Sequence, residues 1–242
     1  MKNNIFPLFF YQGEILKNAA KIIIIAIFVL IVGGIIFLGT LHINEIDYTT
    51  IADTSIGKVE VGISGNESAP KAIALITGIH PRETLSIDPA IQAAREFGND
   101  NVKIIHYKVT VTDNPQDYEQ GRANGESLIH DYVNPNVTAS DADAVIISHS
   151  HNPDYGEWFY LATPDMDNAS VSIAEKISKS SDFNYYPVQG NESYKSTSAV
   201  LVSKPIAQEG YPTFVYEMPE DVSQQTACDK TKELFNLISQ NI

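Results

Sequence analysis

Histidine and glutamate side chains follow three apolar segments of this sequence, and their types suit a metal site. His80 and Glu83 lie three residues apart directly after one apolar run, His149 follows a second run and Glu217 follows a third. Two histidines and one carboxylate form a catalytic zinc set that leaves a coordination position for water. A further carboxylate nearby can act as general base, so we expect hydrolytic chemistry from these four residues.

The segments that carry these residues are predicted to alternate between strands and helices. Predicted strands cover residues 58–64, 72–77, 102–112, 142–148, 199–203 and 213–216, and predicted helices cover 86–97, 169–181 and 221–242, with a long polar connection over 114–133. This alternation indicates an α/β domain with a mostly parallel mixed sheet flanked by helices. Active sites of such sheets lie at the carboxyl ends of the strands, so we expect the four residues to converge there.

Other residues compete for a role in this site or remain outside it. His151 is an alternative to His149, because side chains two apart in an extended segment point the same way. His106 lies inside a predicted strand and is interpreted as structural. The single cysteine, Cys228, excludes both an intramolecular disulfide and a cysteine-based metal site.

The order of the motifs resembles the zinc carboxypeptidase superfamily, which includes the succinylglutamate desuccinylase and aspartoacylase branch. Residues 78–83 (GIHPRE) resemble its first zinc motif, and residues 114–122 (NP followed by GR) resemble the segment that brings a substrate-binding arginine. Residues 143–150 resemble the strand with the third zinc ligand, and residues 213–217 the strand with the catalytic glutamate. The resemblance covers residues 57–220 and implies a zinc carboxypeptidase-like fold.

The resemblance also implies a role for each matching residue. One zinc ion per chain would be bound by His80, Glu83 and His149. Glu217 would deprotonate the zinc-bound water and later protonate the leaving amine. Arg122 would bind a substrate carboxylate or polarise the scissile carbonyl, for which a planar guanidinium with permanent charge is well suited.

Further substrate contacts are expected from residues around these motifs. By the resemblance, Asn124 and Ser150 would contact the substrate beside Arg122. The tyrosine that the family uses has a loose match in Tyr194, and Tyr185 and Tyr186 are alternatives.

One stretch departs from the family pattern. The family carries Asp-Leu-Asn-Arg shortly after the substrate arginine, where residues 127–130 read Ser-Leu-Ile-His. The Asn-Arg pair that grips a terminal carboxylate is therefore missing, and His130 is not equivalent to it. This departure affects the expected exopeptidase specificity more than the expected zinc site.

The charge of the chain excludes one class of partner. The formal net charge is −14, and the residues after position 21 hold 13 basic and 29 acidic side chains, a net of −16. Such an acidic surface repels phosphate backbones, so we expect no nucleic-acid binding.

The N-terminal region carries a predicted membrane segment. Residues 22–41 form a run of 20 uncharged residues, long enough to cross a bilayer core as a helix. Lys17 and Lys21 precede this run, so the positive-inside rule places the N-terminus in the cytoplasm. We predict a cytoplasmic segment (1–21), a transmembrane helix in the lipid bilayer (22–41), a linker (42–56) and an extracytoplasmic carboxypeptidase-like catalytic domain (57–242).

These observations lead to one functional hypothesis with two alternatives. The leading hypothesis is a single-pass cell-membrane protein whose outer domain is a zinc-dependent hydrolase of peptides or other amides. The first alternative is an N-acyl amino acid deacylase of the aspartoacylase type. The second is a catalytically silent peptide-binding domain that kept the fold. The presence of all four residues of the zinc and base set favours an enzyme.

Overall fold

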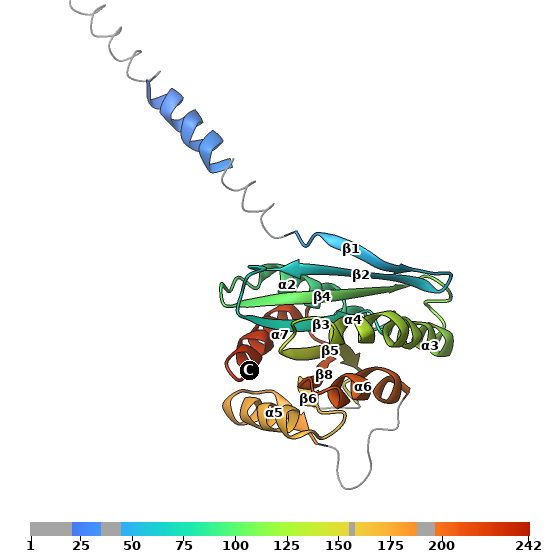
Figure 1. The fold of residues 1–242 in the computed structure, drawn as a ribbon. Helices are drawn as coiled ribbons and strands as arrows, with labels where there is room; N and C mark the ends of the chain where they lie inside the picture. Colours follow the sequence, from blue (N-terminus) through green and yellow to red (C-terminus); the bar gives the residue numbers. More distant parts are fainter. Residues whose placement is uncertain (1–20, 35–44, 155–157, 188–196) are drawn as a thin grey trace, which may run out of the picture. The chain divides into compact units, whose positions relative to one another are not determined.

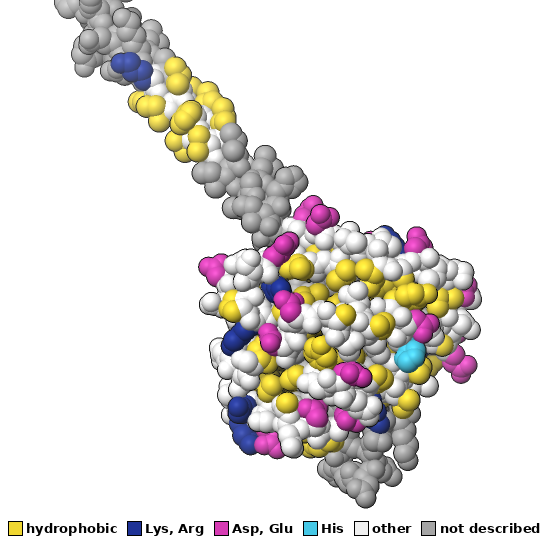
Figure 2. Space-filling view, viewed as in Figure 1, with side chains coloured by type: hydrophobic (Ala, Val, Ile, Leu, Met, Phe, Trp, Pro, Cys, Tyr) yellow, Lys and Arg dark blue, Asp and Glu magenta, His cyan; other side chains and the backbone are white. Residues whose placement is uncertain are grey.

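The computed structural model divides the chain into two units, Met1–Glu45 and Ile46–Ile242. The structure describes residues 21–34, 45–154, 158–187 and 197–242. In the first unit, residues 21–34 are helical. Their exposed large apolar side chains are Ile22, Ile23, Ile24, Ile25, Ile27, Phe28, Val29, Leu30, Ile31 and Val32, and Figure 2 shows this apolar surface. Within the described ranges, no helix is both long and apolar enough to cross a membrane. Residues 22–34 of the predicted span 22–41 belong to this helix, and residues 35–41 lie outside the described part.

The second unit is built on one mixed sheet of eight strands (Figure 1). The strands are β1 (Tyr48–Asp53), β2 (Gly57–Ser64), β3 (Lys71–Thr77), β4 (Val102–Val111), β5 (Ala144–His151), β6 (Tyr160–Ala162), β7 (Asn184–Tyr186) and β8 (Thr213–Pro219). Their order is β1-β2-β4-β3-β5-β8-β6-β7. The four central strands β4, β3, β5 and β8 run parallel, while β2 and β6 pair antiparallel with their inner neighbours.

Helices cover both faces of this sheet (Figure 1). They are α2 (Asp88–Glu96), α3 (Tyr118–Leu128), α4 (Asn134–Thr138), α5 (Asn168–Ser180), α6 (Lys204–Gln208) and α7 (Gln224–Ser239), with a 3₁₀ turn η1 (Thr84–Ser86) and two π-helical turns, η2 (Ile129–Val133) and η3 (Ala199–Ser203). Helices α2, α5 and α7 pack on one face, and α3, α4, α6 and both π-helical turns pack on the other. The predicted α/β fold is therefore confirmed.

The alternation of side chains along the central strands explains the two cores. Ile73 and Leu75 on β3 belong to the core under α2 and α7, while Ala74 and Ile76 belong to the core under α3. Successive residues of a strand point to opposite faces, so a strand covered on both sides must be apolar throughout. The continuous apolar run that predicted β3 has this physical cause.

Several local predictions need correction. Strand β1 lies within the segment 42–56 that we predicted as a linker, and its pairing with β2 makes Ile46 the start of the compact unit. Residues 199–203 were expected to form a strand but form the π-helical turn η3. A short apolar run cannot by itself distinguish a strand from a buried helical segment. The short strands β6 and β7 were not predicted.

Two glycines let the turn after β3 fit between its neighbours. Gly78 has a φ of +84°, and a Cβ there would lie 2.0 Å from the carbonyl oxygen of Val109 on β4. Gly125 on α3 approaches the same turn from the other side, where a Cβ would lie 1.9 Å from the carbonyl oxygen of Ile79. Only glycine allows both approaches, so these residues place His80 directly against α3.

Candidate metal centre

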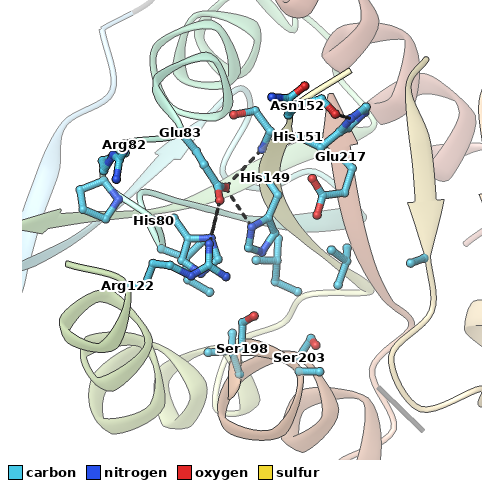
Figure 3. Close-up of a pocket in the computed structure, with 18 of the residues that line it drawn as sticks. His80, Arg82, Glu83, Arg122, His149, His151, Asn152, Ser198, Ser203 and Glu217 are labelled. Atoms are coloured by element: carbon cyan, nitrogen blue, oxygen red, sulfur yellow. Dashed lines mark hydrogen bonds and ion pairs between the residues drawn. The ribbon is translucent and has the colours of Figure 1, made fainter. Parts of the chain in front are cut away.

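The carboxyl ends of β3, β5 and β8 bring the predicted site residues together. Ile76 on β3 pairs with Ile147 on β5, and His149 on β5 pairs with Glu217 on β8. Glu83 reaches the same place from the turn after β3, which continues into η1. Figure 3 shows that His80, Glu83 and His149 converge, with Glu217 beside them.

Glu83 is the centre of the polar contacts in this cluster. Its Oε1 lies 2.6 Å from His80 Nδ1, and its Oε2 lies 3.1 Å from His149 Nδ1. The backbone N–H of Ser150 donates to Oε2 at 3.2 Å. Burial alone would raise the pKa of Glu83, but the neighbouring His149 and His80 hold this pKa well below its usual range. The carboxylate therefore stays ionised, as a metal ligand must.

The geometry of the three side chains fits a small cation. One ligand atom from each of His80, Glu83 and His149 lies within 4.8 Å of the others, and the two imidazole rings are 4.7 Å apart between centroids. Ligands about 2.0–2.1 Å from a tetrahedral zinc ion would be roughly 3.4 Å from one another. The donor set of two imidazole nitrogens and a carboxylate is one that zinc accepts with a position left for water.

Arg122 on α3 is in direct contact with the cluster. Its Nη1 lies 3.3 Å from Glu83 Oε1 and 3.1 Å from His80 Nδ1. Its guanidinium also lies over the ring of Tyr118, 5.3 Å from the ring centroid, and Arg82 lies 5.7 Å from that centroid. The two arginines therefore bring positive charge to the side of the cluster opposite Glu217 (Figure 3).

Glu217 lies on the other side of the cluster and is partly buried. Burial raises the pKa of its carboxyl to about 7; Glu83 acts in the same direction, and His149 opposes it. Glu217 belongs to no ion pair among the described residues, unlike Glu83. A carboxyl with a pKa near neutrality can both accept and release a proton at physiological pH.

The structure separates the two histidines that compete on β5. Both line the same cavity, but only His149 faces Glu83. His151 Nδ1 lies 3.0 Å from the carbonyl oxygen of Asn152, and its Nε2 lies 3.1 Å from that of Trp158. Both ring nitrogens of His151 are thus turned to backbone carbonyls, which favours His149 as the ligand.

Glu126 is a residue of the site that the sequence did not predict. It is buried on α3, with Oε1 3.4 Å from His80 Nε2, and Thr197 Oγ1 donates to the same oxygen at 3.1 Å. Burial alone would lower the pKa of His80, but its hydrogen bonds to the carboxylates of Glu126 and Glu83 outweigh burial and raise this pKa. A carboxylate on the second ring nitrogen fixes the orientation of a metal-binding histidine. No local motif marks Glu126, because its contact depends on how closely α3 approaches Ile79.

The other predicted substrate contacts have different surroundings. Ser150 lines the cavity, and its Oγ donates to Glu220 Oε1 at 3.4 Å. Asn124 does not line the cavity. Its amide nitrogen donates to the carbonyl oxygen of Asp113 at 2.9 Å, and its amide oxygen accepts from Gln120 at 2.8 Å. We therefore leave Asn124 out of the proposed site. Tyr194 lies outside the described residues.

The alternative residues for substrate binding also lie away from the cluster. Tyr185 hydrogen-bonds Thr163 at 2.8 Å, and Tyr186 packs edge-on against Tyr160, which does line the cavity. His130 donates from Nδ1 to the carbonyl oxygen of Leu201 at 3.0 Å and does not line the cavity.

The cluster lies in a cavity of about 520 Å³, large enough for a small peptide or acyl amino acid. Its lining residues are Ile79, His80, Pro81, Arg82, Glu83, Asp117, Tyr118, Arg122, Ile147, His149, Ser150, His151, Asn152, Tyr160, Ala162, Pro164, Ser198, Ala199, Val202, Ser203, Val215, Glu217 and Glu220. The cavity thus combines the candidate metal ligands with a cationic side, an acidic side and an apolar end.

Comparison with solved structures identifies the fold. The chain is similar to a metallo-carboxypeptidase from Burkholderia cenocepacia, with a TM-score of 0.56, 16% identity, and coverage of 84% of this chain and 68% of that one. A provisionally assigned carboxypeptidase from Burkholderia mallei gives a TM-score of 0.58 at 15% identity, covering 85% of this chain and 66% of that one. A provisionally assigned metallopeptidase from Shewanella denitrificans gives 0.50 at 11% identity, covering 81% and 84%.

The carboxypeptidase-like fold that the sequence predicted is thereby confirmed. The chain spans about two thirds of the length of the two Burkholderia proteins. No protein-family profile matches the sequence, and no curated protein does.

Proposed function

We propose that the chain is a metal-dependent hydrolase of amide bonds in peptides or N-acyl amino acids. The observation that carries this proposal is the convergence of His80, Glu83 and His149 beside Glu217 in one cavity. The three ligands would hold zinc, which when bound lowers the pKa of its water toward about 7 and polarises a carbonyl oxygen. The carboxypeptidase-like fold supports the same class of reaction.

Glu217 is the proposed general base and acid. Its partly buried carboxylate lies opposite the cationic side of the cavity and carries no ion pair among the described residues. It would accept a proton from the attacking water and then donate that proton to the nitrogen of the leaving amine. A cation held by the cluster would lower the pKa of Glu217, so the carboxylate would be the form present before reaction.

Arg122 is the proposed electrophilic partner of the substrate. Its guanidinium is held by Tyr118 and Glu83 and has further N–H groups available for an oxyanion. Such a donor stabilises the negative charge that develops on the carbonyl oxygen as water adds. Arg122 thus lies on the acyl side of the scissile bond, and Glu217 lies on the side of the leaving amine.

We also propose that residues 22–41 anchor the domain in a membrane, with residues 46–242 outside the cytoplasm. Support comes from the helix at residues 21–34, whose large apolar side chains are exposed. A helix that exposes apolar side chains along its length is suited to a lipid environment. The lysines before the span support the orientation.

Replacement of Glu217 by Gln tests the proposed reaction. The variant keeps the shape of the side chain but cannot accept a proton. We expect it to bind zinc as the wild type does and to hydrolyse amide substrates at least about a hundredfold more slowly, because general acid–base groups contribute roughly 10²–10⁴-fold. The measurement is turnover of an amide library at matched zinc occupancy.

A matched control is Glu220→Gln. Glu220 is a second carboxylate of the same cavity and directly follows the last residue of β8. We expect it to retain at least about a tenth of wild-type turnover. Near-normal turnover by Glu217→Gln with a severe loss in Glu220→Gln would reassign the base. No turnover by the wild type with any amide would favour the silent binding domain.

A further inference from the structure

One end of the cavity differs in character from the rest. It is formed by Ser198, Val202 and Ser203 around the turn η3, with Ile147 and Val215 from the sheet. The charged lining residues belong to other segments: the turn after β3, α3 and its flank, and β5 and β8 with the residues that follow them. The carboxylate of Glu126 accepts from Thr197 Oγ1, beside Ser198, at 3.1 Å, but Glu126 does not line the cavity. This end, which we call the neutral end, therefore combines apolar surface with two hydroxyl groups.

The π-helical turn explains why both hydroxyls face the cavity. Ser198 and Ser203 are five residues apart, and in an α-helix such residues point about 140° away from each other. In η3 the backbone N–H of Lys204 instead donates to the carbonyl of Ala199, five residues earlier. This wider turn brings residues five apart back to the same side, and π-helical turns are frequent at functional sites. Figure 3 shows Ser198 and Ser203 together on the helical side of the cavity, across from His149.

The π-helical turn is held by side chains from the neighbouring segment. Asn134 Nδ2 donates to the carbonyl oxygens of Leu201 and Val202 at 3.0 and 3.4 Å, and His130 Nδ1 donates to that of Leu201. These bonds serve carbonyl groups that a π-helical turn leaves without their α-helical partners. The position of the two serines is thus fixed from outside the cavity.

Ser203 carries a hydroxyl that the protein does not satisfy. It is 2% exposed, and its Oγ has no hydrogen-bond partner in the described part of the chain. The other buried side-chain atoms without a partner there belong to Asn134, Ser148 and Asp167, none of which lines the cavity. A buried polar group without a partner is unfavourable, so a hydroxyl that lines a cavity is placed to bind a ligand.

We propose that the neutral end selects substrates whose leaving-amine residue carries a side-chain carboxamide, as in glutamine. A carboxamide offers one acceptor and one donor group, and the hydroxyls of Ser198 and Ser203 can serve both. A carboxylate or an ammonium group would lose its hydration there without gaining an opposite charge from the described lining. An apolar side chain would leave the buried hydroxyl of Ser203 unpaired.

The assignment to the leaving-amine residue rests on the proposed function. Glu217 donates the proton to the leaving amine, and Val215 lies two residues earlier on the same face of β8. The residue attached to the leaving amine therefore extends from Glu217 towards Val215 and the neutral end.

The test measures binding and turnover for four peptides that differ only in the leaving-amine residue. Matched N-acyl dipeptides would carry Gln, its apolar near-isostere Met, Glu or Lys at that position. Dissociation constants would be measured by calorimetry on the zinc-loaded Glu217→Gln chain, whose hydrolysis should be at least about a hundredfold slower, and kcat/KM would be measured on the wild type. We expect the Gln peptide to be favoured over Met by roughly tenfold, because a lost hydrogen bond leaves Ser203 unpaired. The Glu and Lys peptides should be weaker still.

Ser203→Ala should reduce the Gln-over-Met preference to within about threefold, mostly through weaker binding of Gln. Ser198→Ala, at a half-buried position, should also reduce the preference. Ser148→Ala removes an equally buried, unpaired hydroxyl outside the cavity and should leave the preference unchanged. Ser203→Ala and Ser148→Ala should not lower the melting temperature appreciably, because neither hydroxyl has a hydrogen-bond partner among the described residues.

Equal affinity of the Glu217→Gln chain for Gln and Met peptides would overturn the inference. So would a full preference that survives in Ser203→Ala. A Gln preference in binding without hydrolysis by the wild type would instead retain the subsite and reject the proposed reaction.

Discussion

At the scale of single residues, the candidate ligands could be predicted from the sequence because each follows an apolar run. His80, His149 and Glu217 could be placed at one edge of the sheet without knowledge of any contact. Glu126 could not, because its hydrogen bond to His80 spans 46 residues and depends on the packing of α3. The sequence alone also left His149 and His151 as competing ligands, and the contact between His149 and Glu83 is the structural reason for preferring His149.

His106 shows a second residue whose role depends on packing. It is fully buried on β4, with Nδ1 2.6 Å from Tyr48 Oη and Nε2 2.9 Å from Thr77 Oγ1. Burial lowers the pKa of His106 to about 3, and the positive charges of Lys108 and Arg95 act in the same direction. The neutral ring thus links β1 and β3 across the sheet, in agreement with the structural role expected for it.

This burial predicts a loss of stability in acid. An unfolded chain binds a proton on His106 near pH 6.5, while the folded chain resists it down to about pH 3. Between these values the unfolded state holds more protons, so its free energy falls relative to the folded state as pH decreases. The contribution is about 1.4 kcal/mol per pH unit within that window.

The variant His106→Gln isolates this contribution. Urea unfolding of the metal-free 46–242 unit would be measured at pH 7 and pH 5 for both proteins. We expect the wild type to lose about 2 kcal/mol more than the variant over this interval. Equal losses would show that His106 does not titrate as its surroundings indicate.

At the scale of elements, the long apolar strands and the amphipathic helices were predicted well, and short or irregular elements were not. Strands β3 and β4 and helix α5 start within one residue of their predicted positions. The turn η3 was predicted as a strand, because the run Ala-Val-Leu-Val carries no helical period. Its conformation is set by Asn134 and His130, which lie more than 60 residues earlier in the chain. Long-range contacts of this kind have no local sequence signal.

The close approach of α3 to the turn after β3 can be tested with Gly125→Ala. Glycine to alanine inside a helix ordinarily stabilises by about 1 kcal/mol. Here the new Cβ would lie 1.9 Å from the carbonyl oxygen of Ile79, so backbone must move. We expect a destabilisation of about 1–3 kcal/mol in chemical denaturation, with weaker metal binding because His80 moves.

Gly98→Ala is the matched control, since a Cβ at Gly98 meets nothing within 4 Å. It should change the free energy of unfolding by less than about 1 kcal/mol. A stabilised Gly125→Ala would contradict the close packing of α3 against this turn.

At the scale of the whole molecule, the chain joins an apolar helical segment to an acidic α/β unit. Acidic side chains are spread over the visible surface of the α/β unit (Figure 2), which agrees with the net charge of −16 after position 21. A strongly acidic surface keeps the unit soluble and away from anionic headgroups. Under the proposed anchoring, residues 22–41 would contact the bilayer.

The proposed orientation can be tested by protease added to intact cells. We expect the 46–242 unit to be digested while the membrane is closed, because lysines before a membrane span favour a cytoplasmic N-terminus. A tag placed before residue 1 should stay protected in the same cells and serves as the control. Protection of the 46–242 unit until the membrane is opened would reverse the orientation.

The central claim is that His80, Glu83 and His149 hold one metal ion, and metal analysis of the purified chain tests it most directly. After zinc loading and desalting, the wild type should retain about one zinc per chain. His80→Ala and His149→Ala should lose most of it, while His151→Ala, a histidine of the same cavity, should retain it. Full zinc occupancy in His80→Ala would contradict the account. So would loss of zinc in His151→Ala together with full zinc occupancy in His149→Ala.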